Sequence, residues 1–106
     1  MKYKILRTDK ADALIRNIIL YIAETFGKDV ALTKLDEMET AIQSLGDNPY
    51  LGEEPRYPAL RRQGYRVLIL KKDLVFYKVD ELKKEIMIYA VVDQRQDYLS
   101  IIRGLC

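Results

Sequence analysis

The apolar residues change their spacing near the middle of the chain. Up to residue 45 they recur every three or four residues, which is the period of an amphipathic helix. From residue 65 they stand in short runs rich in Val, Ile, Leu, Tyr and Phe, which is the composition of strands. Helices followed by strands, rather than alternating with them, indicate an α+β fold.

A first helix is expected to follow a short strand at Tyr3–Leu6. Thr8 or Asp9 is the expected N-cap of this helix, and Gly27 is expected to end it. The apolar residues between these points share one helical face and are Ala11, Leu14, Ile15, Ile18, Ile19 and Ile22.

A second helix is expected from Ala31 to Leu45, where apolar residues again alternate steps of four and three, and Gly46 is its expected C-cap. Because the link between the helices is so short, they must pack antiparallel, as a helical hairpin on a sheet. The next stretch, 47–58, contains all three prolines and is expected to be a loop.

Three strands are expected in the second half, at Tyr65–Leu70, Leu74–Val79 and Glu85–Val92. The links of three and five residues between them allow only antiparallel neighbours, so the strands are expected to form a meander. Leu60–Arg62 is expected as a possible fourth, irregular strand. Residues 98–102 are expected to form a short terminal helix.

The 106 residues are expected to fold as one domain, 1–106, because a second core would have too few residues to bury. No apolar run approaches the roughly 20 residues of a membrane helix, and no export signal is visible. The one cysteine, Cys106, fits a reducing compartment. A cytoplasmic protein with no membrane partner is therefore expected.

The chain lacks histidine, which removes the usual acid–base residue and the commonest zinc ligand. A single cysteine excludes a Cys-rich metal site. Asp93 and Asp97 flank Arg95, but a site for a hard cation brings together more carboxylates than two. The expected task of these carboxylates is to orient Arg95, and neither a metal nor another cofactor is expected.

Positive charge is concentrated in the second half of the chain. Residues 1–55 carry 7 basic and 10 acidic side chains, whereas residues 56–106 carry 11 and 6. Within this half, six cations and no carboxylate lie between residues 56 and 72: Arg56, Arg61, Arg62, Arg66, Lys71 and Lys72. Such a stretch suits a polyanion or an acidic partner, although basic residues also protect an exposed strand edge.

Four segments, in this order, resemble the RelE/ParE toxin family of type II toxin–antitoxin systems. They are Asn48–Gly52, Tyr65–Ile69, Leu74–Asp80 and Ile88–Tyr98. Members of that family commonly show a proline–glycine loop, a valine–phenylalanine–tyrosine strand and a last strand that ends in an arginine–aspartate–tyrosine cluster. The resemblance implies a toxin of the fold described above, neutralised by a cognate antitoxin protein.

The resemblance implies, as the first hypothesis, that the toxin cuts mRNA on the ribosome. Metal-independent cleavage of RNA requires a base, a proton donor and cations for the phosphorane charge. Arg66, Arg95 and Tyr98 are the candidate catalytic residues, the arginines as cations and the tyrosine as a stacking group or proton donor. Without histidine, Lys71 or Lys72 would have to act as the base.

The alternative hypothesis is a ParE-like inhibitor of DNA gyrase, which requires a complementary surface but no catalytic base. Asp93 stands where many relatives carry histidine, and Leu68 and Leu74 stand where RNA-cutting relatives carry cations, so these positions favour the alternative. A third hypothesis is an inert member of the family. The candidate RNA-binding or antitoxin-binding residues are Arg61, Arg62, Lys71 and Lys72.

Overall fold

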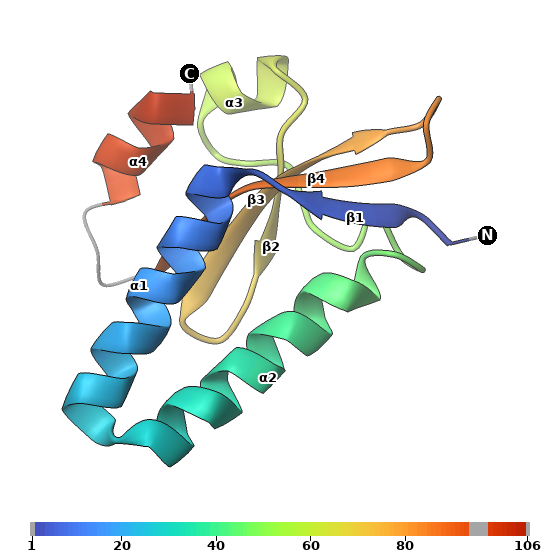
Figure 1. Ribbon diagram of the computed structural model, residues 1–106. Coiled ribbons are helices and arrows are strands. Elements are labelled where there is room, and N and C mark those ends of the chain that lie inside the picture. Colours follow the sequence, from blue (N-terminus) through green and yellow to red (C-terminus); the bar gives the residue numbers. More distant parts are fainter. Residues whose placement is uncertain (1, 94–97, 106) are drawn as a thin grey trace.

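The computed structural model describes residues 2–93 and 98–105 (Figure 1). In chain order its elements are β1 (Lys4–Arg7), α1 (Asp9–Phe26), α2 (Lys28–Ser44), α3 (Pro58–Arg62), β2 (Arg66–Ile69), β3 (Asp73–Asp80), β4 (Glu85–Asp93) and α4 (Tyr98–Leu105). The strands form one sheet in the order β1-β4-β3-β2. The antiparallel meander of β2, β3 and β4 is confirmed, and β1 joins it parallel to β4.

The helical hairpin begins and turns where the sequence predicts. Thr8 is the N-cap of α1, since its side-chain oxygen accepts a hydrogen bond of 3.0 Å from the amide of Ala11. Gly27, with φ of 96°, ends α1 and also precedes α2. With one residue between them, the helices run in opposite directions on the same face of the sheet (Figure 1).

Gly46 is not the C-cap of α2, so that prediction is wrong by one residue. The helix ends at Ser44, and Leu45 is its C-cap in a right-handed conformation. Gly46 instead meets the start of the chain, where its carbonyl oxygen accepts a hydrogen bond of 2.8 Å from the amide of Tyr3. A Cβ atom at Gly46 would lie 3.2 Å from the carbonyl oxygen of Tyr3, so close approach explains the glycine.

The predicted fourth strand at Leu60–Arg62 is also wrong, because these residues form the second half of α3. Pro58 occupies the first turn of α3, where its missing N–H group is not needed. Gly64, with φ of 88°, then reverses the chain, and the amide of Tyr65 donates back to the carbonyl oxygen of Leu60 at 3.1 Å. The fourth strand of the sheet is β1.

Both faces of the sheet are covered. Helices α1 and α2 cover one face, where the fully buried side chains include Ile42, Val75, Tyr77, Ile88 and Val91. Helices α3 and α4 cover the other face over a second cluster, formed by Leu60, Tyr65, Val67, Phe76, Ala90 and Val92 with Leu105 packed against it. No helix within residues 2–93 and 98–105 is long and apolar enough to cross a membrane.

A buried ion pair joins α2 to the sheet. Asp73, at the start of β3, is fully buried and pairs with the ammonium group of Lys34 on α2. Asp93 lies opposite Asp73 at the end of β4 and is also buried. Two carboxylates therefore share this end of the sheet, and Lys34 supplies the positive charge that Asp73 requires in an apolar environment.

Replacing Lys34 by Met is expected to lower the free energy of unfolding by about 3 kcal/mol, because the Asp73 charge would stay buried without its partner. Urea unfolding of the two proteins measures the difference. Lys72→Met, which removes an exposed charge, is the matched control and is expected to stay within about 0.5 kcal/mol of wild type. A Lys34→Met protein as stable as the control would contradict the role of the pair.

Candidate functional site

The proline-containing loop 47–57 is held against the sheet by a buried tyrosine. The hydroxyl of Tyr77, on β3, donates to the carbonyl oxygen of Pro49 at 2.8 Å and accepts from the amide of Gly52 at 3.0 Å. A Cβ atom at Gly52 would lie 2.7 Å from that hydroxyl and 2.7 Å from the carbonyl oxygen of Val67. Only glycine therefore fits where the loop crosses this tyrosine.

The same loop covers part of the outer edge of β2. Glu53 exchanges two backbone hydrogen bonds of 2.9 Å with Val67, as in an antiparallel pair. An uncovered edge strand presents unpaired backbone groups to other chains. Loop 47–57 is thus a partial fifth strand, and its position is set by the backbone of β2 as well as by Tyr77.

Arg66, a predicted catalytic residue, is directed at this loop. Its Nη2 atom donates to the carbonyl oxygen of Gly52 and, at 3.4 Å, to that of Tyr50. Its guanidinium carbon lies 5.1 Å from the centre of the Tyr50 ring, a cation–π contact. Within the described residues its Nε atom is buried with no acceptor. Arg66 therefore holds the loop in place.

The predicted binding cations do not form one cluster. Arg61 also serves the loop, since its Nη1 atom donates to the carbonyl oxygens of Pro55 and Arg56 at 3.0 Å each. Arg62, at the end of α3, and the pair of Lys71 and Lys72, in the β2–β3 turn, are exposed. Strand β2 separates Arg62 from the lysine pair, so the structure places these cations at opposite ends of the strand.

Arg95 lies outside the described residues. Tyr98 is the first residue of α4, and its side chain also lies outside the described part of the chain. The catalytic roles of both residues stay predictions. Asp93, at the position where the resemblance implies a histidine, is buried at the end of β4.

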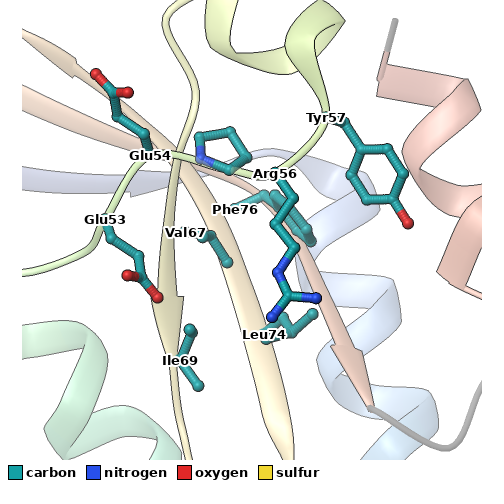
Figure 2. Close-up of a pocket in the computed structure, with 9 residues that line it drawn as sticks. Glu53, Glu54, Arg56, Tyr57, Val67, Ile69, Leu74 and Phe76 are labelled. Atoms are coloured by element: carbon teal, nitrogen blue, oxygen red, sulfur yellow. The ribbon is translucent and has the colours of Figure 1, made fainter.

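A pocket of about 470 Å³ opens beside the loop, on the sheet face that carries α3 and α4 (Figure 2). Four apolar side chains of β2 and β3 line it, namely Val67, Ile69, Leu74 and Phe76. The loop adds Pro55 and four polar residues, namely Glu53, Glu54, Arg56 and Tyr57. Figure 2 shows Arg56 extending across the pocket toward Leu74 and Tyr57 pointing toward α4. An apolar pocket with a few polar groups suits an apolar group of a partner.

Leu68 and Leu74, where the resemblance implies cations in RNA-cutting toxins, lie on opposite faces of the sheet. Leu74 lines the pocket, whereas Leu68 is buried under α1 and α2. Neither position can supply positive charge to a phosphorane. In the described residues, no three His, Cys, Asp or Glu side chains come together as metal ligands would.

A second set of contacts ties the loop to the β3–β4 turn. Glu81 accepts hydrogen bonds from the hydroxyl of Tyr50 at 2.6 Å and from that of Tyr3 at 2.8 Å, and the Lys84 ammonium lies 3.4 Å from it. We call these four residues the Glu81 clasp. The hydrogen bonds from Tyr50 and then Tyr3 lower the pKa of the Glu81 carboxyl, and the bond to Glu81 raises the pKa of Tyr50.

Three residues that organise this site are not identified by the sequence analysis: Tyr77, Glu53 and Glu81. Tyr77 carries a usable signal, because alternation along β3 places it on the buried face, where its hydroxyl requires a partner. Glu53 and Glu81 carry none. Their partners are distant in sequence, since Glu81 lies 31 positions after Tyr50, and no local pattern pairs them.

The sequence matches the family model of the ParE toxin of the type II toxin–antitoxin system parDE over residues 5–98. That range covers most of the chain and includes the loop, the pocket and the sheet. The chain therefore belongs to the ParE toxin family, within the wider RelE/ParE group. The comparison of the sequence with curated proteins gives no match.

Solved structures of the same group share the fold. The chromosomal ParDE system of P. aeruginosa is similar with a TM-score of 0.72 and 22% identity, over 87% of this chain and 96% of that one. The RelBE2 toxin–antitoxin complex of Mycobacterium tuberculosis gives 0.60 and 15%, over 88% and 99%. A variant of the E. coli toxin RelE in the free state gives 0.61 and 12%, over 100% of both chains.

Replacing Tyr77 by Phe is expected to reduce the free energy of unfolding by about 1–3 kcal/mol, because the buried amide of Gly52 would lose its acceptor. Tyr89→Phe is the matched control, since the hydroxyl of Tyr89 has no hydrogen bond within the described residues. Amide hydrogen exchange should also accelerate at Gly52 in the Tyr77→Phe protein. Unchanged exchange at this amide would show that Tyr77 does not hold the loop.

The Glu81 clasp is expected to weaken in acid. The folded pKa of Glu81 lies below its ordinary value of 4.5, so the carboxylate stabilises the fold above that pH, and the contribution is lost as the pH falls through the lowered pKa. Urea unfolding of wild type and Glu81→Gln measures this. The stability advantage of wild type should be present near neutral pH and shrink below pH 4.5. A difference that does not depend on pH would contradict the clasp.

Proposed function

We propose that this chain is a toxin that acts by binding a protein target, DNA gyrase, and that it does so without catalysis. The observation that carries the proposal is the apolar pocket at Leu74, a position where the resemblance to RNA-cutting toxins requires a cation. A pocket of this kind accepts an aliphatic or aromatic side chain of another protein. The Leu74 side chain supplies no charge to a developing phosphorane.

The state of Arg66 supports the same proposal. Cleavage of RNA requires cations aimed at the phosphate as its charge develops. The guanidinium of Arg66 instead donates to two loop carbonyls and lies over the Tyr50 ring. Turning it toward a phosphate would break these bonds and release the loop. With no histidine in the chain, no ordinary base accompanies it.

Ribosome-dependent cleavage of mRNA is the second candidate. The exposed side chains of Arg62, Lys71 and Lys72 favour it, because cations on the surface suit the phosphate backbone of RNA. The same cations also suit an acidic protein, so they support RNA less specifically than the pocket supports a protein.

A cognate antitoxin is the second partner that we propose. Two of the similar structures are described as a ParDE system and as a RelBE2 toxin–antitoxin complex. An acidic antitoxin segment would be attracted to Arg62, Lys71 and Lys72, and this attraction would speed association at low salt. We place the pair in the cytoplasm, where gyrase and the ribosome act.

The test is a supercoiling assay with purified toxin and gyrase, run beside primer extension on mRNA from arrested cells. Wild type should inhibit supercoiling and leave messages uncut. Ile69→Asp, which places a charge in the pocket at a side chain that is 54% exposed, should weaken inhibition at least tenfold, or about 1.4 kcal/mol. Lys71→Ala/Lys72→Ala should inhibit as wild type does.

The opposite pattern would reject the proposal. It consists of messages cut within translated regions, supercoiling unaffected by wild type, and loss of growth arrest in the double lysine variant but not in Ile69→Asp. Thermal unfolding of each variant shows whether it is folded, since Ile69 is half-exposed and its replacement should not remove the fold.

A further inference from the structure

The most exposed large apolar side chain in the described residues lies at the tip of the β3–β4 hairpin. Leu82 is 98% exposed, with Glu81 before it and Lys83 after it. Single exposed leucines are common on protein surfaces and by themselves indicate nothing. Leu82 differs in its setting, because the turn that carries it is held by contacts from two other parts of the chain, the N-terminal segment with β1 and loop 47–57.

Within the turn itself, the backbone is closed by side-chain and main-chain hydrogen bonds. The Asp80 carboxylate accepts from the amide of Lys83 at 3.1 Å. Lys84 adopts a backbone φ of 53°, which residues other than glycine rarely adopt. Its carbonyl oxygen accepts a hydrogen bond from the amide of Lys4 at 3.0 Å. Strand β1 therefore supports the end of the turn.

The Glu81 clasp adds side-chain contacts to the turn. Tyr3, from the N-terminal segment, and Tyr50, from loop 47–57, both donate to the carboxylate of Glu81. Surface turns are usually the most mobile parts of a fold. Here two tyrosines and Lys84 converge on one carboxylate directly beside Leu82, so the exposed leucine lies on a supported turn, at the end of the β3–β4 hairpin in Figure 1.

The clasp also connects the turn to the pocket. Tyr50 contacts Glu81 on one side and Arg66 on the other, and Arg66 holds the carbonyl of Gly52, next to Glu53 at the pocket rim. The hairpin tip and the pocket are therefore connected by side-chain contacts through loop 47–57. The same loop therefore borders the pocket and contacts the turn that carries the hairpin tip.

We infer that the β3–β4 turn is a second contact of the toxin with its protein target, in which Leu82 enters an apolar recess that has carboxylates at its border. The side chain projects as a knob, so the matching surface must be concave and apolar. Lys84 is paired with Glu81 in the clasp, whereas Lys83 follows Leu82 directly, so carboxylates suit the border near Lys83. The preformed turn lowers the entropic cost of binding. The inference rests on the proposed function in requiring a protein target.

The test compares full-length variants in the supercoiling assay and in growth arrest. Leu82→Ser should weaken both at least tenfold, as the loss of a central apolar contact does. Leu20→Ser, the same change at a leucine 53% exposed on α1, should act as wild type. Glu81→Ala should lower inhibition and growth arrest several-fold, because the turn becomes mobile. Glu81→Gln should keep most of the wild-type activity, because its amide oxygen still accepts hydrogen bonds from the tyrosines.

Each outcome decides the matter. Full activity of Leu82→Ser in both assays overturns the inference, and so does a loss of antitoxin binding with growth arrest intact, which would assign the tip to the antitoxin. If wild type leaves gyrase unaffected while Leu82→Ser abolishes growth arrest, the proposed target fails and the inference stands. Equal thermal stability of Leu82→Ser and wild type is expected, because the side chain is 98% exposed.

Discussion

Strand β3 carries apolar side chains on both of its faces, and the rest of the structure is arranged to cover them. Phe76 and Tyr77 are neighbours that point to opposite faces, and they are 2% and 0% exposed. Covering both requires a helical layer on each side. Helices α1 and α2 form one layer, and the short α3 and α4 form the other. These layers leave open the pocket beside loop 47–57 and the β3–β4 turn, which are the two partner contacts that we propose.

The buried hydroxyl of Tyr77 links this core to the functional surface. A tyrosine in an apolar core requires a partner for its hydroxyl, and loop 47–57 supplies two, the Pro49 carbonyl and the Gly52 amide. Once the loop lies there, Arg66 satisfies its carbonyls and is no longer a free cation. The requirement of the core thus commits Arg66 to the loop, beside which the pocket lies.

Periodicity and composition predicted the helical hairpin, the meander and the terminal helix, because burial on one face of an element leaves a repeating pattern along the chain. The two errors have local causes. Leu60–Arg62 is too short to show a period, and the turn around Gly64 decides that it is helical. Gly46 follows a helix, as a capping glycine does, but the structure requires glycine there because the backbone of Tyr3 lies so close.

The sequence by itself determined the fold class, the order of the elements apart from α3, the toxin family and the excess of positive charge in the second half, since each depends on residues that are close in the chain. Only the tertiary structure decided which charges are free. Arg61, Arg66, Lys71 and Lys72 look alike in the sequence, yet the first two bind loop carbonyls and the last two face solvent. The difference arises from contacts between residues that are far apart in the chain. Arg66 and Gly52, for example, are 14 positions apart, and no local pattern records their contact.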